Sequence, residues 1–229
     1  MKYDILLFDA DETLFDFEAS EKEALKLTMI DFDFDYNEEY HLTLYKEINT
    51  AIWKELEQGI ITQKQLKIER FNRFLVALQS NIDATEFATR YMKHLANASL
   101  LYEFSYDIIQ QLHKNYRLAI VTNGLTDVQN GRVRNSTIGH FFDQIVISEE
   151  VGLSKPDPKI FEYALNKMNY TDKSRVLMIG DSLSSDIQGG INCGIDTCWY
   201  NPNTISISSN INPTYEIHEM NELFDILSK

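Results

Sequence analysis

The sequence predicts an α/β fold, in which a parallel sheet core is interrupted after its first strand by an inserted all-helical cap domain. Short apolar runs alternate with segments of helical periodicity over the second half of the 229-residue chain, a pattern typical of βαβ units. Before Leu101 the chain holds a single glycine, Gly59, and no proline, and so few helix breakers favour helices. The apolar run at residues 4–9 must join the later strands, because alone it would bury nothing.

The core strands are expected where short apolar runs end in polar residues or glycine. Leu118 to Val121, for example, leads directly into Thr122. Between these runs apolar residues recur at helical spacing, and Pro156 or Pro158 can begin one of the helices. We expect strands at residues 4–9, 118–121, 144–147, 176–179 and 195–199, and helices at 105–114, 126–137, 157–168 and 184–192.

The inserted domain is predicted to span residues 17–98, which leaves residues 1–16 and 99–229 for the core. Apolar residues recur at helical spacing through the insertion, and three or four helices are expected there. Gly59 breaks the long middle run, and Thr62 is a suitable N-cap for the helix that follows.

The charge balance limits the kinds of partner. The chain has 21 Lys and Arg against 35 Asp and Glu, a formal net charge of −14. So acidic a protein should repel nucleic acid polymers and anionic membrane surfaces. An anionic substrate would therefore need a local positive site, and a bound metal is the simplest way to supply one.

The cysteines and the apolar runs indicate where the protein works. Cys193 and Cys198 form neither a Cys-x-x-Cys pair nor a metal-ligand set, and free buried thiols are typical of a reducing cytosol. The first apolar run is too short for a signal peptide, and no stretch approaches the length of a membrane span. We expect a cytoplasmic protein, a monomer or a small homo-oligomer, with no membrane partner.

Two carboxylates, Asp9 and Asp11, follow the first predicted strand. Open α/β sheets bind ligands beyond the carboxyl ends of their strands. One carboxylate can attack phosphorus, while the other protonates the leaving group and then deprotonates water, which is the division of labour that an aspartyl-phosphate mechanism requires. In this hypothesis Asp9 is the nucleophile and Asp11 the general acid and base. Taken alone, such a pair is more often a polar turn that closes a core strand.

Polar side chains also follow or flank the other predicted strands. In a parallel sheet every strand has its carboxyl end at the same edge, so these side chains can converge in one crevice at that edge. Taken singly, each segment could be a turn, a solvated loop or a helix N-cap, but their shared position favours one site. The residues are Thr122, Asn123 and Gly124 after the second strand, Lys155 before a helix, and Asp181 and Asp186 after a later strand.

Each of these groups can serve phosphoryl transfer. The Thr122 hydroxyl and the backbone amides of residues 122–124 can donate to phosphoryl oxygens, and Lys155 adds a positive charge to the same oxygens. Asp181, with Asp186 behind it, offers the hard oxygen ligands that Mg²⁺ requires. The ion would also offset the repulsion between a carboxylate nucleophile and a phosphate dianion. The predicted substrate is a small phosphorylated metabolite.

At this point the sequence resembles the haloacid dehalogenase (HAD) superfamily of hydrolases. The four segments match the four motifs of that superfamily in order, and the resemblance covers essentially the whole chain, with a helical cap inserted after the first motif. The matching residues are Asp9-x-Asp11-x-Thr13, Thr122, Lys155, and Gly180-Asp181-x₄-Asp186.

This resemblance implies a Rossmann-like core and an aspartyl-phosphate intermediate. It also implies a Mg²⁺ or Mn²⁺ ion held by the Asp9 carboxylate, the Asp11 main-chain carbonyl and Asp181, with Asp186 assisting directly or through water. Dehalogenases of the superfamily lack an acid at the position of Asp11, so Asp11 favours phosphate esters over carbon–halogen bonds.

A closer resemblance is to the YjjG-like pyrimidine 5′-nucleotidases, which remove phosphate from pyrimidine nucleoside monophosphates. Glu12, within the first motif, agrees with this subgroup. The other matching segments are Val146 to Gly152, Lys155-Pro156-x-Pro158-Lys159-Ile160-Phe161, Ser174 to Asp181, and Trp53-x₅-Gly59-x-Ile61-Thr62 in the cap.

Substrate choice is expected to reside in the cap, because the core chemistry is generic. Trp53 could stack on a base, and Arg70 could meet a polar edge or an anion, although a Trp on an amphipathic helix usually packs and an Arg usually forms a surface or interhelix pair. Two alternatives stay open: a broad sugar-phosphate or phosphoglycolate phosphatase with the same core, and a phospho-acceptor signalling module. In such modules the acidic metal ligands precede the acceptor, whereas here they follow it.

Overall fold

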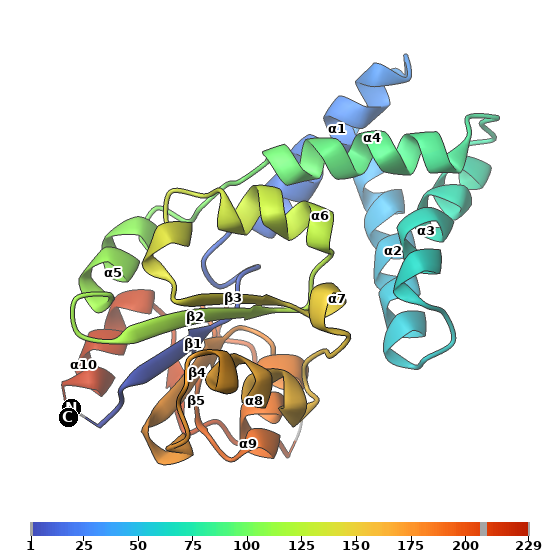
Figure 1. Ribbon diagram of the computed structural model, residues 1–229. Coiled ribbons are helices and arrows are strands. Elements are labelled where there is room, and N and C mark those ends of the chain that lie inside the picture. The colour runs from blue at the N-terminus through green and yellow to red at the C-terminus, as the bar shows by residue number, and fades with distance from the viewer. Residues whose placement is uncertain (1, 207–209, 229) are drawn as a thin grey trace. The chain divides into compact units, whose positions relative to one another are not determined.

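The structure is a computed structural model that describes residues 2–206 and 210–228 (Figure 1). The chain divides into two compact units. The first, here called the sheet unit, holds the residues up to Phe17 and those from Ser99 onward. The second, the helical unit, is Glu18–Ala98.

Within the described residues, six parallel strands form one sheet in the order β3-β2-β1-β4-β5-β6. The first strand lies at the centre, where Phe8 is in register with Ile120 on one side and Ile179 on the other. The predicted α/β class is therefore confirmed. The strands are β1 (Ile5–Phe8), β2 (Arg117–Thr122), β3 (Gln144–Ile147), β4 (Val176–Gly180), β5 (Asp196–Tyr200) and β6 (Tyr215–Ile217).

Helices cover both faces of the sheet, which is why its central strands are apolar throughout. Pro158 stands at the first turn of its helix behind the N-cap Asp157, as its fixed φ favours. The helices of the sheet unit beyond Ser99 are α5 (Ser105–Leu112), α6 (Thr126–Gln129), α7 (Ser148–Val151), α8 (Pro158–Lys167), α9 (Gln188–Cys193) and α10 (Leu223–Leu227).

Successive residues of each strand point to opposite faces, so the sheet has two apolar cores. Leu6 and Phe8 of β1 belong to the core that includes α5 and α10. Ile5 and Leu7 belong to the other core, with α8 and α9, which lie together along the sheet in Figure 1. Burial on both faces stabilises β1, and it thereby supports the residues that follow it.

Some predicted elements differ from the observed ones. The helix expected at 126–137 is the single turn α6 followed by a π-helical turn, η1 (Asn130–Arg134), and the helix expected at 184–192 begins with a π-helical turn, η4 (Leu183–Ile187). The short elements α7, β6 and α10 were not predicted. β6 has three residues, of which one is buried, so it lacks the apolar run from which a strand could be predicted.

The inserted region folds into four helices, in agreement with the expected three or four. Thr62 caps α3 as predicted: its Oγ1 accepts from the Gln65 backbone N–H (3.3 Å), and the Gln65 side chain accepts from the Thr62 backbone N–H (2.9 Å). Gly59 follows α2 with a φ of +71°, a conformation that glycine adopts without strain. The helices are α1 (Phe17–Asp31), α2 (Glu38–Glu57), α3 (Gln63–Ala77) and α4 (Ala84–Asn97).

Buried aromatic rings form the interior of the helical unit. They come from α2, α3 and α4, and neighbouring ring centroids lie 4.8–6.1 Å apart. Each such pair adds roughly 0.5–1.5 kcal/mol beyond the area it buries. The rings are Tyr45, Phe71, Phe74, Phe87 and Tyr91.

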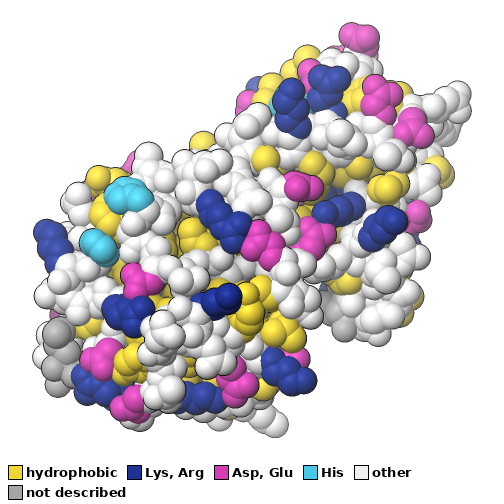
Figure 2. Space-filling model, in the orientation of Figure 1, with side chains coloured by type: hydrophobic (Ala, Val, Ile, Leu, Met, Phe, Trp, Pro, Cys, Tyr) yellow, Lys and Arg dark blue, Asp and Glu magenta, His cyan; other side chains and the backbone are white. Residues whose placement is uncertain are grey.

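On the face of the molecule in Figure 2, Lys and Arg side chains are interspersed with Asp and Glu. The acidic excess, a formal net charge of −14, is a property of the whole sequence, and it disfavours polyanionic partners. Among the described residues, no helix is both long enough and apolar enough to cross a bilayer.

Candidate active site

Side chains with acid, base and hydrogen-bonding chemistry gather at the carboxyl edge of the sheet. Asp9 directly follows β1, Thr122 is the last residue of β2, and Asp181 directly follows β4. The Asp9 backbone N–H donates to the carbonyl of Ile179 (2.9 Å), which ties the end of β1 to the end of β4. Open parallel sheets bind their ligands at this edge.

The ammonium group of Lys155 lies between two carboxylates. Its Nζ donates to Asp9 Oδ1 (2.5 Å) and lies 2.7 Å from Asp186 Oδ1. All three side chains are buried. Charge-assisted hydrogen bonds are roughly twice as strong as neutral ones, so Lys155 holds the Asp9 carboxylate in a defined position and offsets part of its charge.

The segment after β4 supplies Asp186 and a third carboxylate, Asp181. Asp181 Oδ1 accepts from the Thr13 hydroxyl (3.2 Å), and Asp186 Oδ2 accepts from the backbone N–H of Ser182 (3.0 Å). Gly180 makes room for the second of them, because a Cβ at this position would lie 2.3 Å from Asp186 Oδ2. Glycine at the end of β4 is therefore required by the close approach of the Asp186 carboxylate to the backbone.

Three carboxylates of this edge are close enough to share a cation. Asp9, Asp181 and Asp186 each offer one oxygen, and these oxygens lie within 4.8 Å of one another. Three acidic groups face one buried ammonium group, so the cluster carries surplus negative charge. Hard carboxylate oxygens are the ligands that Mg²⁺ and Mn²⁺ prefer, and the residues present therefore fit a divalent metal.

The pKa values of the cluster also favour a bound cation. Burial raises the pKa of Asp9 well above its ordinary value, with Lys155 opposing the shift and Asp186 adding to it. Burial, reinforced by Asp186, raises the pKa of Asp181 to about 7. Burial alone would lower the pKa of Lys155, but Asp186 and Asp9 raise it above its ordinary value. The raised pKa values of Asp9 and Asp181 show that negative charge in this cluster is unfavourable without a nearby cation, and a divalent metal would relieve it.

Asp11 lies in a separate hydrogen-bond network. Arg132 Nη1 donates to its Oδ1 (2.6 Å), and Gln129 Nε2 donates to its Oδ2 (2.9 Å). Neither Gln129 nor Arg132 was predicted from the sequence. Their spacing of three residues places both on one face of the helical segment after β2, and this is the only local signal that they carry.

The residues after β2 have different surroundings from one another. Thr122 is buried, and its Oγ1 accepts from Gln129 Nε2 (3.0 Å). The Asn123 side chain bonds the main chain of Lys155 at both ends, donating to its carbonyl and accepting from its N–H, each at 2.8 Å. The Asn123 amide thus supports Lys155, a contact that the sequence did not indicate.

The two cap residues singled out in the sequence lie in the helical unit. Trp53 of α2 is half-buried. Arg70 of α3 is 2% exposed and its guanidinium lies 4.8 Å from the Phe71 ring centroid, with the Asn49 amide oxygen 3.4 Å from Nη1. The partners of Arg70 therefore come from the interior of its own unit.

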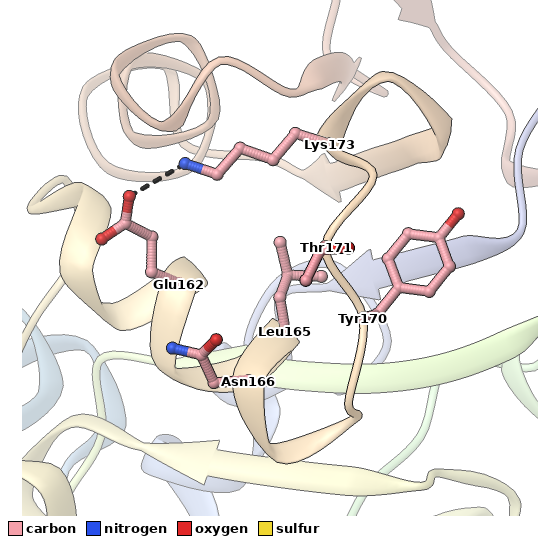
Figure 3. Close-up of a pocket in the computed structure, with 6 residues that line it drawn as sticks. All are labelled: Glu162, Leu165, Asn166, Tyr170, Thr171 and Lys173. Carbon is pink, nitrogen blue, oxygen red and sulfur yellow. Dashed lines mark hydrogen bonds and ion pairs between the residues drawn. The ribbon is translucent and has the colours of Figure 1, made fainter.

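A cavity of about 210 Å³ lies elsewhere in the sheet unit (Figure 3). It is bounded by the end of α8 and by the chain that leads into β4, so it lies toward the amino ends of the strands. A salt bridge between Lys173 Nζ and Glu162 Oε1 (2.8 Å) spans its wall. The cavity holds none of the carboxylates described above and does not belong to the candidate site.

The parallel α/β sheet carries paired acids after its first strand, a buried lysine and a distal pair of acids, in the order of the four hydrolase motifs found in the sequence. The chain belongs to the haloacid dehalogenase-like hydrolases, whose family profile matches residues 6–200. The resemblance inferred from the four motifs is therefore confirmed.

Individual relatives are similar over their full lengths. The chain is 37% identical to the pyrimidine 5′-nucleotidase PynA of Streptococcus pneumoniae, covering 100% of this chain and 97% of that protein. It is 34% identical to the pyrimidine 5′-nucleotidase YjjG of Escherichia coli, covering 100% of both. Its structure matches the magnesium-bound crystal structure of the HAD-hydrolase YfnB of Bacillus subtilis with a TM-score of 0.92 at 35% identity, covering 100% of both chains.

Proposed function

We propose that the protein is a metal-dependent phosphatase that hydrolyses nucleoside 5′-monophosphates, pyrimidine nucleotides foremost, through an aspartyl-phosphate on Asp9. The observation that carries this proposal is the buried Asp9 carboxylate, bonded to Lys155 at 2.5 Å, with Asp181 and Asp186 beside it. The full-length similarity to two pyrimidine 5′-nucleotidases supports the substrate class.

Mg²⁺, with Mn²⁺ as the alternative, is the proposed cofactor. Asp9, Asp181 and the main-chain carbonyl of Asp11 would hold it, and Asp186 would assist, since its oxygens already accept from Lys155 and Ser182. When bound, the ion supplies the positive charge that offsets repulsion between the carboxylate nucleophile and the phosphate dianion. The magnesium in the YfnB structure supports this choice.

In the first step an oxygen of the Asp9 carboxylate forms a bond to phosphorus while the bond from phosphorus to the ester oxygen breaks. Asp11 gives its proton to the departing oxygen, so the nucleoside leaves as a neutral alcohol. Lys155 keeps the attacking carboxylate in place. Because Thr122 Oγ1 accepts from Gln129, its own hydroxyl proton is available to a phosphoryl oxygen.

In the second step Asp11, now a carboxylate, takes a proton from water. The water oxygen bonds to phosphorus, the bond between phosphorus and Asp9 breaks, and inorganic phosphate departs. Asp9 is again a carboxylate and Asp11 again carries its proton, so the cycle closes. A phospho-acceptor module would stop after the first step, and steady release of phosphate distinguishes the two.

The helical unit is the proposed source of substrate preference, with Trp53 as the residue that would stack on the base. Arg70, the other candidate, is less suited to contact substrate, because its guanidinium is enclosed by Asn49 and aromatic rings. The proposed protein is a monomer or a small homo-oligomer that acts on a small phosphorylated metabolite.

The test is a panel of substrates with Mg²⁺ present. UMP, dUMP and dTMP are compared with phosphoglycolate and hexose phosphates by release of inorganic phosphate. We expect higher kcat/KM for the nucleotides, and no turnover in EDTA until Mg²⁺ is restored. Equal or better turnover of the sugar phosphates would overturn the nucleotidase assignment and leave the broader phosphatase.

A further inference from the structure

We propose that Gln129 and Arg132 are positioning residues that hold the Asp11 carboxylate in the orientation in which it exchanges protons with the substrate. This inference rests on the proposed function, since it concerns the residue assigned there as acid and base. The two residues follow β2, and Asp11 follows β1, so the sheet brings them together. The pair Gln129 and Arg132 is called the Asp11 clamp below.

Arg132 contributes a buried charge to the clamp. Its side chain is fully buried, and its guanidinium lies over the rings of Phe15 (5.7 Å) and Phe17 (5.0 Å). From there Nη1 donates to Asp11 Oδ1 at 2.6 Å. A guanidinium packed on two rings has few alternative orientations, so it fixes the place of the oxygen that it binds.

Gln129 contributes a neutral donor whose orientation is set by its neighbours. Its Oε1 accepts from Arg132 Nη1 (3.3 Å), and this contact turns its Nε2 toward Asp11 Oδ2 (2.9 Å). The same Nε2 donates to Thr122 Oγ1 at 3.0 Å. One amide group therefore links the proposed acid and base to the proposed phosphate-binding hydroxyl.

Gly124 shows that the backbone has been shaped to admit this amide. A Cβ at position 124 would lie 2.4 Å from Gln129 Cγ and 2.7 Å from its Nε2, both too short for non-bonded atoms. The glycine predicted as part of a phosphate-binding turn is thus also the residue that leaves space for the clamp.

The clamp leaves Asp11 able to react. A carboxylate offers about four acceptor positions, and the clamp uses one on each oxygen, so positions remain for the transferred proton and for water. The Asp11 side chain is 27% exposed, whereas Arg132 has no exposure. Turning the carboxylate would break both hydrogen bonds. A general acid works only within hydrogen-bond reach of the atom that it protonates, and a misplacement of about 1 Å can cost about 10²-fold in rate.

The experiment compares substrates that need an acid with substrates that do not. A nucleotide has an alkoxide leaving group that must be protonated, whereas p-nitrophenyl phosphate has a leaving group stable as an anion. Because kcat/KM reports only the steps up to departure of the leaving group, its ratio between UMP and p-nitrophenyl phosphate measures general-acid catalysis. The ratio is also independent of the fraction of enzyme that is folded.

The variants are Arg132→Met and Gln129→Leu, which keep the bulk of each side chain and remove its hydrogen bonds to Asp11. We expect the ratio of kcat/KM for UMP to that for p-nitrophenyl phosphate to fall by about 10- to 100-fold in Arg132→Met and by about 10-fold in Gln129→Leu. Arg132→Lys, which retains the charge, should recover part of the loss.

Arg134→Met is the matched control. Arg134 belongs to the same π-helical turn, but its Nη1 pairs with Glu150 Oε1 (2.6 Å) at the surface. We expect the ratio to stay at the wild-type value in this variant. A merely structural role for the clamp would lower kcat/KM for both substrates equally in Arg132→Met and Gln129→Leu, and that result, or no change at all, would overturn the proposal.

Asp11→Asn separates failure of the clamp from failure of the mechanism. Comparing the ratio of wild-type protein with that of Asp11→Asn tests the acid role of Asp11 without reference to the clamp. We expect the ratio to fall sharply in Asp11→Asn. Arg132→Met added to Asp11→Asn should then leave the ratio unchanged, since no acid remains to be positioned. If Asp11→Asn itself spares the ratio, the assigned role of Asp11 is wrong and the clamp proposal is overturned with it.

Discussion

Each unit of the protein buries an arginine, and the two arginines have different partners. Arg132 in the sheet unit lies 2.6 Å from the Asp11 carboxylate, which is partly exposed at the edge of the sheet. Arg70 in the helical unit meets the Asn49 amide oxygen at 3.4 Å and the Met92 sulfur at 3.3 Å. Its charge also rests on the faces of aromatic rings, an arrangement that favours cations.

The comparison shows that burial of a charge does not by itself locate chemistry. Both guanidinium groups have been removed from water, at a cost that only good partners offset. In the sheet unit the partner is a carboxylate that water can still reach, so the pair can act on a substrate. In the helical unit the partners of Arg70 are interior groups, so this arginine contributes to packing. Mutations should therefore affect activity in one unit and stability in the other.

The largest effect is expected at the nucleophile. Asp9→Asn removes the attacking carboxylate while keeping nearly the same shape, so phosphatase activity and the phosphorylated intermediate should both disappear. Phosphate release and mass spectrometry of the trapped protein measure the two. Asp143→Asn is the control, because Asp143 pairs with Arg117 at the surface (2.7 Å) and should leave turnover near the wild-type value. Residual activity of Asp9→Asn near that of wild type would contradict the mechanism.

The next effect is at the proton donor. Asp11→Asn should lower kcat for UMP by about 10²- to 10⁴-fold, as loss of a general acid and base does. The variant keeps a hydrogen-bonding amide beside Arg132, so its circular dichroism should match that of wild type. A kcat within a few-fold of wild type would show that another group moves the proton.

A smaller effect, on stability, is expected in the helical unit. Arg70→Met removes the contacts to the Asn49 amide oxygen and the Met92 sulfur, and it leaves the buried Asn49 oxygen without this donor. We expect the free energy of unfolding in urea to fall by about 1–3 kcal/mol. Unchanged stability combined with a large rise in KM for UMP would show that Arg70 contacts substrate, and would break the contrast between the two arginines.

The smallest effect is a pH dependence of metal stabilisation. Burial raises the pKa of Asp181 from 3.8 to about 7 in the folded protein, so the folded state binds a proton more tightly than the unfolded state. In EDTA, this group therefore makes stability fall as the pH rises from about 4 to about 7. A cation takes the proton's place, so the rise in Tm caused by Mg²⁺ should be larger at about pH 8 than at about pH 5.

The matched variant for this measurement is Asp181→Asn. It lacks the titrating carboxylate, so the increase in Tm on adding Mg²⁺ should be small and nearly the same at both pH values. Taking the difference between Mg²⁺ and EDTA removes the contribution of groups elsewhere in the chain. A Mg²⁺ effect that is larger in acid would contradict the placement of the cation beside Asp181.

Much of the fold was predictable because its signals are local. Apolar runs of strand length predicted β1 to β5, and the scarcity of helix breakers predicted three or four helices in the insertion, where four are observed. Thr62 could be identified as an N-cap from its type and position. The strand β6 could not be predicted, because it depends on pairing with β5 rather than on a pattern in its own residues.

Part of the site could likewise be predicted from local sequence patterns, and part of it could not. Asp9, Thr122 and Asp181 were predictable because each ends or follows an apolar run, and parallel strands bring their carboxyl ends to one edge. Asn123 was predicted at the site, but its contact with the Lys155 main chain was not. That contact joins segments far apart in the chain, and no local pattern encodes it.

The sequence by itself determined which residues stand at the ends of the strands, since hydrophobic periodicity and chain order decide that. Only the tertiary structure decided that Gln129 and Arg132 hold Asp11 and that Arg70 faces an aromatic interior. The physical reason is that the local pattern of a helix shows which positions are polar or apolar, but the partner of each side chain is set by packing against distant segments.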